Sequence, residues 1–256
     1  MLLTVDIGNT NVVMGLMPER GLLASNLRFP TDKRRTVQEF MEGFEALVAM
    51  HGFDFSNVNG AIVSSVVPEL TDSVVASVRA KTGDAPLVVD HRMDLGFTID
   101  METPEKLGVD MIADAAGAIN DYDGNLAIFD MGTATTCSVV SADRVYLGSI
   151  IMPGVVISQD ALTAKASALP FIKFERPKRL IGRDTVDCMR SGVIYANAAM
   201  MDGLVDRISD ELGGPVLAVA TGGISRLIVP ACRRYVVHDP NLLLKGLWDL
   251  YHRNIS

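Results

Sequence analysis

Residues 1–17, MLLTVDIGNTNVVMGLM, decide the fold of this chain. A β-branched apolar run reaches Asp6, a short polar turn follows at residues 8–10, and a second apolar run resumes at Val12. The pattern predicts two buried antiparallel strands joined by a tight turn. Because the turn holds a glycine, an amide and a hydroxyl next to a carboxylate, it is either a hairpin that carries chemistry or a plain hairpin.

The same pattern occurs a second time in the chain. Residues 126–141, LAIFDMGTATTCSVVS, again place an apolar run, an aspartate and a Gly-hydroxyl turn in that order, and Asp130 follows Asp6 by 124 positions. In each half two more antiparallel strands are expected, and then alternating helices and strands. This internal repeat predicts an α/β fold of two similar mixed-sheet domains, residues 1–114 and 115–256, with substrates in the cleft between them.

Composition limits the classes of function. With 48% hydrophobic and 21% charged residues over 256 positions, the chain has the composition of a globular protein with a sizeable core. A net charge of −8 argues against non-specific nucleic-acid binding. No apolar run approaches the ~18 residues of a membrane-spanning helix, and Asp6 interrupts any signal peptide. Three widely spaced cysteines indicate a reducing compartment, so we expect a cytoplasmic protein.

Basic residues gather in two stretches, and neither predicts a nucleic-acid site. Residues 32–35, Asp-Lys-Arg-Arg, are expected to form a solvated loop. Residues 173–183 contain two arginines, two lysines and a further arginine at the end. We expect an exposed loop there, or else a mobile flap over a site.

One predicted helix joins the two halves. Thr103, Pro104 and Glu105 form a good helix start, with a hydroxyl N-cap, a proline at the first position and an acid next. The helix is expected over residues 104–120, with Asp110 about two turns along it. Asp110 is either a functional carboxylate at the join between the halves or a helix residue paired with Lys106. Two further helices are expected near residues 36–50 and 184–212.

The two turns have the chemistry of a polyphosphate site. Glycine lets neighbouring backbone N–H groups point outward together, and small polar side chains add donors. Two such turns facing each other would hold the β- and γ-phosphates of a nucleotide, with Asp6 and Asp130 holding cations directly or through water. The segment Thr221, Gly222 and Gly223 lies between a buried strand and a helix. It suits close approach of a base and ribose to bare backbone. P-loop, Rossmann and zincin motifs are absent from the sequence.

These residues resemble a known group. The two D-x-G turns and the late T-G-G are similar to the motifs of the acetate kinase, sugar kinase, Hsp70 and actin superfamily. Within it, the whole chain resembles the type III pantothenate kinases. The matching segments are D-I-G-N-T-N at 6–11, S-S-V-V-P at 64–68, D-M-G-T-A-T-T at 130–136 and G-S-I-I-M-P-G-V-V-I-S-Q-D-A-L at 148–162.

The resemblance implies two ribonuclease H-like domains and a specific reaction. Enzymes of this family transfer the γ-phosphate of ATP to the primary hydroxyl of pantothenate, the first step of coenzyme A synthesis, and they are homodimers that use Mg²⁺ and a monovalent cation (K⁺ or NH₄⁺). By motif position, Asp110 would be the general base, Asp6 would hold Mg²⁺ and Asp130 the monovalent cation. ATP would contact Asp6, Ile7, Gly8, Asn9, Thr10, Asn11, Val12, Val13, Gly132, Thr133, Thr221, Gly222 and Gly223. The acceptor would contact Met101, Gly108, Val109, Asp110, Met111 and Thr185.

The acceptor motifs depart from the family pattern. The family has G-x-D-R, where this chain has Met111 in place of the arginine, and it has Y-x-N-P, where this chain has Met101 in place of the tyrosine. Methionine does not replace a bidentate guanidinium. Another basic residue, Arg92, Lys106 or Arg183, reaches the substrate carboxylate instead, or the acceptor is a different small alcohol. In a third interpretation, the protein is an ATP-binding regulator without turnover, similar to Bvg accessory factors.

Overall fold

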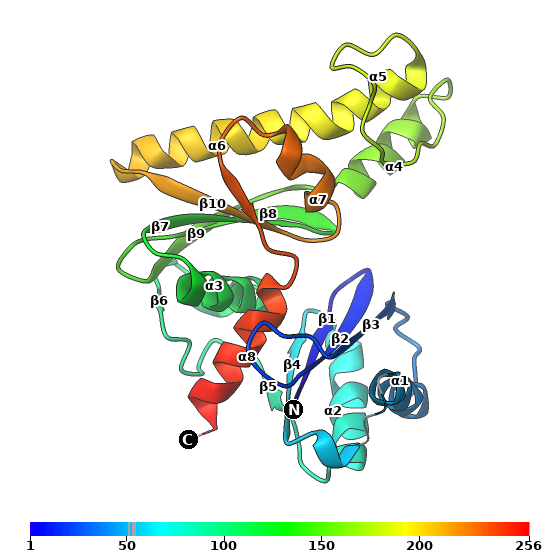
Figure 1. The fold of residues 1–256 in the computed structure, drawn as a ribbon, viewed down its shortest axis with the longest axis vertical. Helices are drawn as coiled ribbons and strands as arrows, with labels where there is room; N and C mark the ends of the chain where they lie inside the picture. The colour runs from blue at the N-terminus through cyan, green and yellow to red at the C-terminus, as the bar shows by residue number, and fades with distance from the viewer. Residues whose placement is uncertain (51, 53–54, 256) are drawn as a thin grey trace. The chain divides into compact units, whose positions relative to one another are not determined.

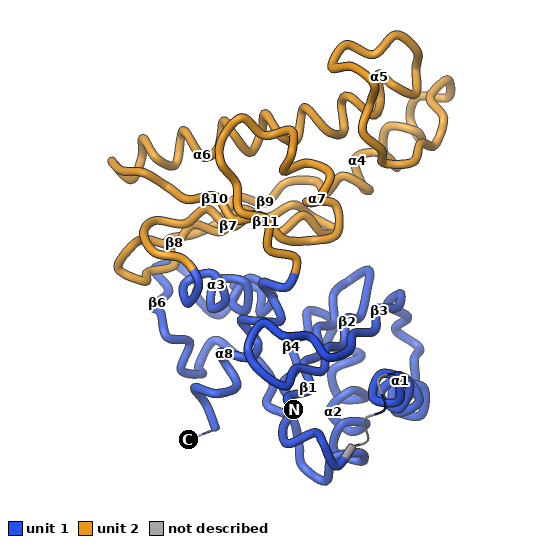
Figure 2. Tube along the Cα trace, in the orientation of Figure 1, with its two compact units in different colours: residues 1–121, 241–256 blue, residues 122–240 orange. Residues whose placement is uncertain are grey.

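The computed structural model describes residues 1–50, 52 and 55–255 (Figure 1). The chain forms two compact units, which Figure 2 shows in different colours. Unit 1 contains Met1–Asp121 and Asn241–Ser256, and unit 2 contains Tyr122–Pro240. No described helix is both long enough and apolar enough to cross a membrane.

Unit 1 begins with the predicted hairpin and continues with alternating helices and strands. Its strands are β1 (Leu2–Ile7), β2 (Asn11–Met17), β3 (Ser25–Pro30), β4 (Gly60–Ser65), β5 (Leu87–Val88) and β6 (Thr98–Ile99). Its helices are α1 (Val37–Ala49), α2 (Pro68–Thr82), α3 (Val109–Asp121) and α8 (Leu242–Asn254), with 3₁₀ turns η1 (Phe55–Asn57) and η2 (Pro104–Lys106).

The sheet of unit 1 has the strand order β3-β2-β1-β4-β5. β1 pairs antiparallel with β2, and β2 pairs antiparallel with β3. β4 lies parallel to β1 on its other side, and β5 lies parallel to β4. The sheet is therefore mixed, as the sequence predicts.

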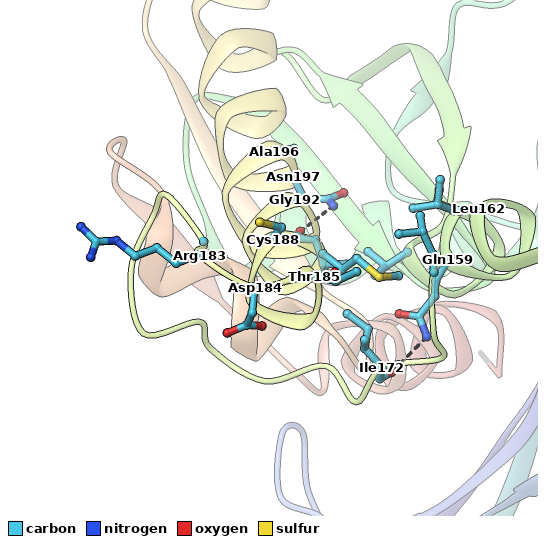
Figure 3. Close-up of a pocket in the computed structure, with 16 residues that line it drawn as sticks. Gln159, Leu162, Ile172, Arg183, Asp184, Thr185, Cys188, Gly192, Ala196 and Asn197 are labelled. Atoms are coloured by element: carbon cyan, nitrogen blue, oxygen red, sulfur yellow. Dashed lines mark hydrogen bonds between the residues drawn. The ribbon is translucent and has the colours of Figure 1, made fainter. Parts of the chain in front are cut away.

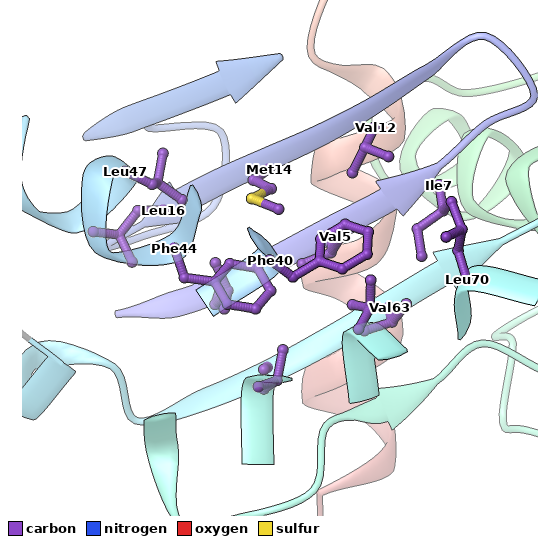
Figure 4. Packing of buried hydrophobic residues seen from close by; sticks show 14 of the residues in the cluster. Val5, Ile7, Val12, Met14, Leu16, Phe40, Phe44, Leu47, Val63 and Leu70 are labelled. Atoms are coloured by element: carbon purple, nitrogen blue, oxygen red, sulfur yellow. The ribbon is translucent and has the colours of Figure 1, made fainter. Parts of the chain in front are cut away.

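Alternation along β1 separates a core face from a second face. Leu3, Val5 and Ile7 point into one apolar cluster together with Phe40 and Phe44 of α1 (Figure 4). Because side chains of a strand alternate between faces, Asp6 belongs to the opposite face. In the pairing register Asp6 lies beside Val13 of β2 and Ser64 of β4.

Unit 2 repeats this plan. Its strands are β7 (Asn125–Met131), β8 (Ala134–Val140), β9 (Val145–Pro153), β10 (Val216–Thr221) and β11 (Val236–His238). Its helices are α4 (Val155–Lys165), α5 (Thr185–Ser191), α6 (Asn197–Leu212) and α7 (Ser225–Ile228), with the π-helical segment η3 (Gly192–Ala196) and the 3₁₀ turn η4 (Val229–Ala231).

Strand order shows the repeat most clearly. In unit 2 the strands β9, β8, β7, β10 and β11 are neighbours in that order, with β7-β8 and β8-β9 antiparallel and β10 parallel to β7. Numbered from the first strand of each set, β1–β5 of unit 1 and β7–β11 of unit 2 both have the order 3-2-1-4-5. The predicted α/β class, with two similar mixed-sheet domains, is confirmed.

Two details of the fold differ from the sequence prediction. The helix expected over residues 104–120 is a short 3₁₀ turn followed by a separate α3, because Leu107 between them has extended backbone angles (φ −64°, ψ 129°). The helix expected over 184–212 is present, but it contains the π segment η3 in its middle.

The boundaries of the two compact units differ from those of the predicted halves, residues 1–114 and 115–256. The predicted halves describe the sequence repeat, and as domain boundaries they stay a prediction. The last helix, α8, belongs to unit 1 because it packs closely against α3. Glycines allow this approach: a Cβ atom on Gly246 would lie 1.7 Å from the carbonyl oxygen of Ala113, and one on Gly117 would lie 2.5 Å from that of Leu242.

Candidate active site

The turn between β1 and β2 is closed by backbone hydrogen bonds. The N–H of Gly8 donates to the carbonyl of Asn11 at 3.0 Å. Thr31, just beyond β3, forms two more hydrogen bonds to this turn. Its hydroxyl donates to the carbonyl of Gly8 at 2.6 Å, and its N–H donates to the carbonyl of Thr10 at 2.9 Å. Asn9 and Thr10 are exposed, so a ligand can approach the tip of the turn.

The turn between β7 and β8 is one residue shorter. Gly132 donates its N–H to the carbonyl of Ala134 at 3.0 Å, and Thr133 at the tip is exposed. Three residues separate β1 from β2, whereas Gly132 and Thr133 alone separate β7 from β8.

Asp6 and Asp130 hold equivalent positions. Each is the last but one residue of the first strand of its sheet. The residues on either side, Ile7 in one unit and Phe129 and Met131 in the other, face the core cluster, so both carboxylates belong to the opposite face. This equivalence of place, face and neighbouring turn is the strongest structural evidence for a shared chemical task.

In unit 2 the segment after β10 lies directly against Asp130. Thr221 pairs with Asp130 in the sheet register. Gly222 has φ +86°, and a Cβ atom there would lie 2.6 Å from a carboxylate oxygen of Asp130. The structure therefore brings together the Thr-Gly-Gly segment and the second turn, which lie about 90 residues apart in the chain.

A second glycine contact closes the other side of this turn. Gly154 precedes α4, and a Cβ atom on it would lie 2.1 Å from the carbonyl oxygen of Thr133 and 2.7 Å from that of Gly132. The sequence prediction did not include Gly154 among the site residues. The Pro153-Gly154 pair before a helix was the available signal, since a glycine between a strand and a helix often marks close backbone approach.

The donor set can be compared with the cations that the resemblance implies. Among the described residues, His, Cys, Asp and Glu side chains form no group of three or more that could hold a metal ion. Mg²⁺ in phosphate-transfer sites usually takes one or two protein carboxylates and completes its shell with substrate phosphates and water. Single carboxylates at Asp6 and Asp130, each beside a turn, fit that kind of site and do not fit an all-protein cage.

Asp110 has the environment of a proton acceptor. It lies in the first turn of α3, and the N–H of Met111 donates to its carboxylate at 2.9 Å. Burial raises the pKa of Asp110 above its ordinary value, and that hydrogen bond opposes the shift only in part. A Cβ atom on Gly108 would lie 2.5 Å from the carboxylate oxygen, so a side chain there would displace the carboxylate of Asp110. Among the described residues, the hydrogen-bond partner of the Asp110 carboxylate is the N–H of Met111 and not Lys106, so the alternative prediction of a pair with Lys106 is not supported.

Thr185 lies in unit 2, in a cavity of about 860 Å³ between α4 and the α5–η3 helix (Figure 3). It is the first residue of α5, capped by Asp184, which accepts from the N–H of Asp187 at 2.9 Å. The lining is mostly apolar, and Gln159 donates from its amide to the carbonyl of Ile172 at 3.0 Å.

The three basic residues considered as substitutes for the missing arginine differ in their surroundings. Arg92 is bound through two hydrogen bonds to Asp90, with Nε at 2.7 Å. Lys106 is exposed on the 3₁₀ turn before α3. Arg183 borders the cavity of Thr185, but its side chain points away from the cavity in Figure 3.

Within each unit, then, several predicted residues lie together. Unit 1 contains residues 6–13 on the first hairpin and residues 108–111 at the start of α3, with Met101 half-buried before it. Unit 2 contains the second turn, the segment 221–223 and Thr185. That these groups meet at one nucleotide and one acceptor stays a prediction.

Comparison with known proteins gives a consistent family. Residues 2–207 match the family model described as type III pantothenate kinase. A type III pantothenate kinase of Moorella thermoacetica is 37% identical over 99% of this chain and 100% of its own length. The corresponding enzyme of Bacillus cytotoxicus is 35% identical over 99% of this chain and 97% of its own.

A solved structure supports the architecture independently of close sequence similarity. A ROK family glucokinase of Streptomyces griseus superposes with a TM-score of 0.50 at 14% identity, over 97% of this chain and 98% of its own. This similarity concerns the fold alone, and it agrees with the expected two ribonuclease H-like domains. The sequence matches, which cover nearly the full length, decide the family. The chain belongs to the type III pantothenate kinase family.

Proposed function

We propose that this chain transfers the γ-phosphate of ATP to the primary hydroxyl of pantothenate, giving 4′-phosphopantothenate and ADP. The observation that carries the proposal is the equivalence of Asp6 and Asp130, each beside a Gly-containing turn on the same face of a 3-2-1-4-5 sheet. Together with the family match, this repeat favours a nucleotide polyphosphate as the ligand.

The nucleotide would be divided between the two hairpins and the segment after β10. Residues 6–13 would bind phosphates, with Asp6 holding Mg²⁺ directly or through water. Gly132 and Thr133 would bind phosphate from the second turn, and Asp130 would hold a monovalent cation, K⁺ or NH₄⁺. Thr221, Gly222 and Gly223 would contact the base and ribose. The bare backbone at Gly222, which packs on Asp130, supports a close approach of ligand there.

Phosphoryl transfer needs little covalent chemistry from the protein beyond positioning and charge neutralisation. Asp110 would accept the proton of the pantothenate hydroxyl while the hydroxyl oxygen attacks the γ-phosphorus and ADP leaves. Its raised pKa makes the carboxylate a stronger base than an exposed aspartate. Mg²⁺ and the monovalent cation would supply neutralisation of the phosphate charge when bound.

The acceptor would contact Gly108, Val109, Asp110, Met111, Met101 and Thr185. Met111 and Met101 lie where the family has an arginine and a tyrosine, so two polar contacts to pantothenate are lost. A charge-assisted hydrogen bond contributes about 1.5–3 kcal/mol, so we expect a higher KM for pantothenate than an arginine-containing pocket would give.

We also propose a homodimer, with no nucleic-acid or membrane partner, in the cytoplasm. Several large apolar side chains of unit 2 are exposed in the single chain, and exposed apolar surface favours a partner. On β9 and α4 these are Ile151, Val156, Ile157 and Leu162, and on the segment before α5 they are Phe171, Leu180 and Ile181.

An ADP-release assay with pantothenate tests the reaction. Wild-type protein should release ADP only when pantothenate, Mg²⁺ and K⁺ or NH₄⁺ are all present. Asp110→Asn should lower kcat by at least ~10²-fold, the usual scale for a general base, whereas exposed Asp100→Asn should not change it. Wild-type protein that binds ATP but releases no ADP with pantothenate would favour the regulator instead.

A further inference from the structure

The segment between β3 and α1 is attached to the first turn. Thr31 donates to two of the turn's carbonyls, those of Gly8 and Thr10, at 2.6 and 2.9 Å. The chain then forms a tight turn in which the N–H of Arg35 donates to the carbonyl of Asp32 at 3.0 Å. The basic residues 33–35 are therefore held at the same end of the sheet as the turn at residues 8–10.

Two of these three basic side chains are already paired. Arg34 binds Asp32 through Nε at 3.1 Å and Nη2 at 3.0 Å. Lys33 binds Glu69 of α2 at 2.7 Å. Both are exposed. For Lys33 and Arg34, the predicted solvated loop agrees with the structure.

Arg35 differs from its neighbours. Its guanidinium carbon lies 4.2 Å from the ring centroid of Phe29 and 5.8 Å from that of Phe40. The residue is half-buried, and its Nε is buried without a hydrogen-bond partner. The expectation of a solvated loop is wrong for Arg35, because two aromatic rings hold its side chain against the end of β3.

No carboxylate in the described structure forms an ion pair with Arg35. The positive charge of Arg35 helps to lower the pKa of two nearby acids, Asp32 and Glu39. Asp32 is bound to Arg34, and Glu39 accepts from the N–H and hydroxyl of Thr36 in the cap of α1. The buried Nε is out of reach of a ligand, so a ligand would bind Arg35 through its terminal Nη groups, which are not among the buried unpartnered atoms.

A phosphate ligand would match the charge of this guanidinium, which forms no ion pair in the described structure. Guanidinium presents several N–H donors in a planar fork that matches phosphate oxygens, and stacking on aromatic rings fixes its orientation before the ligand arrives. We propose that Arg35 is a further phosphate-binding residue, which donates to the terminal phosphates of the nucleotide held by the turn at residues 8–10. This inference rests on the proposed function, because it takes the first turn as a nucleotide phosphate site.

Calorimetric titration of the full-length protein with Mg²⁺–ATP and with adenosine tests this role. Arg35→Met keeps much of the apolar stem over Phe29 and removes the charge, and Arg35→Lys keeps the charge and removes the fork. Arg34→Met is the matched control, since the neighbouring side chain is exposed and bound to Asp32. The midpoint of thermal unfolding checks that each variant is folded.

Arg35→Met is expected to raise the Kd of Mg²⁺–ATP at least tenfold and to leave the Kd of adenosine within twofold of wild type. The Kd of Mg²⁺–ATP for Arg35→Lys should lie between the values for wild type and Arg35→Met. The Kd for Arg34→Met should equal that of wild type. Equal ATP affinity in folded Arg35→Met or Arg35→Lys overturns the proposal. A raised KM for pantothenate with unchanged ATP affinity also overturns it, because the guanidinium would then serve the acceptor carboxylate.

These outcomes are separate from those of the proposed function. If wild-type protein binds ATP and loses affinity with Arg35→Met but never phosphorylates pantothenate, the reaction is wrong and the role of Arg35 holds. If pantothenate is phosphorylated and Arg35→Met binds ATP normally, the reaction holds and Arg35 has no such role. Wild-type protein that binds no nucleotide would contradict both.

Discussion

Asp110 combines partial burial with a position at the start of α3, and its raised pKa has consequences for activity. A general base must be ionised to accept a proton, so the rate should fall as the pH drops through the pKa of Asp110. Because burial raises that pKa, we expect the acidic limb of the kcat/KM profile above the ~3.9 of an ordinary aspartate. Measuring kcat/KM against pH checks this, and a limb at or below that value would contradict it.

The same shift predicts an effect on stability. A raised pKa in the folded state means that folding disfavours the ionised carboxylate, so stability is lost as the pH rises through the folded pKa. Asp110→Asn should therefore unfold at higher denaturant concentration than wild type at pH 8, and the difference should vanish below the pKa of the unfolded chain. Urea denaturation at pH 8 and pH 3.5 measures both. A stabilising effect that persists unchanged at pH 3.5 would contradict the electrostatic cause.

Gly222 is predicted to be essential for the position of Asp130. Alanine there would combine a left-handed backbone with a Cβ atom 2.6 Å from the carboxylate. We expect Gly222→Ala to weaken ATP binding more than tenfold and to lower the free energy of unfolding by about 1–3 kcal/mol. Gly124→Ala is the control, since its φ is +88° but no atom lies within 4 Å of its Cβ position. If both variants bind ATP equally, the contact with Asp130 does not matter.

For single residues, the sequence predicted the two turns and their aspartates, because period-two alternation and Gly-hydroxyl turns are local patterns. It could not indicate that Gly154 packs on Thr133 or that Gly222 packs on Asp130, since these contacts join distant parts of the chain. The position of Arg35 on Phe29 also depends on tertiary packing, so the basic run alone suggested a solvated loop.

Among the elements, α3 and α8 are joined by a charged network to the turn after β2. Arg20 donates to Asp249 at 2.6 and 2.7 Å and also binds Asp121, which accepts from Lys245 at 2.8 Å. Burial acts to raise the pKa of Asp121, but the bonds from Lys245 and Arg20 outweigh it and lower that pKa. These pairs are largely shielded from solvent, so they should matter more than surface ion pairs.

Removing Arg20 should therefore destabilise unit 1. Arg20→Met leaves two shielded carboxylates, Asp121 and Asp249, with only Lys245 nearby. We expect a loss of about 2–3 kcal/mol in the free energy of unfolding, and the loss should shrink as the pH falls and the carboxylates become protonated. Arg34→Met, at an exposed pair, should have no measurable effect. Equal stabilities of the two variants in urea denaturation would contradict the importance of the network.

The elements themselves were predicted well where their periodicity was regular. The three-strand meanders and α1 are present as expected, whereas the helix expected over 104–120 is interrupted at Leu107. The π segment η3 has no sequence signal that separates it from the helix on either side. Three of its residues, Gly192, Val193 and Ala196, line the cavity that contains Thr185, and π segments often occur at functional sites.

For the whole molecule, the internal repeat predicted the two sheets, but the return of α8 to unit 1 was not predicted. Nothing in residues 242–254 alone indicates whether the helix packs on the second half or on α3. Gly117 of α3 and Gly246 of α8 favour packing of α8 on α3, because their lack of side chains permits close approach of the two helices.

The proposed homodimer gives a prediction at this scale. If the exposed apolar side chains of unit 2 are buried between two copies, Ile151→Asp should produce monomers in analytical ultracentrifugation, since Ile151 is 70% exposed in the single chain. Leu22→Asp introduces the same charge at an exposed leucine of unit 1 and should leave the dimer intact. Monomeric wild-type protein, or a dimer unaffected by Ile151→Asp, would contradict this interface.

One measurement tests the central claim most directly: phosphorus NMR of a reaction that contains the protein, Mg²⁺–ATP, a potassium salt and pantothenate. A phosphomonoester signal should grow in step with ADP, and mass spectrometry should identify it as singly phosphorylated pantothenate. Asp110→Asn should yield almost none in the same time. Loss of the γ-phosphate signal as free inorganic phosphate, or an unchanged spectrum while ATP is bound, would contradict pantothenate phosphorylation by this chain.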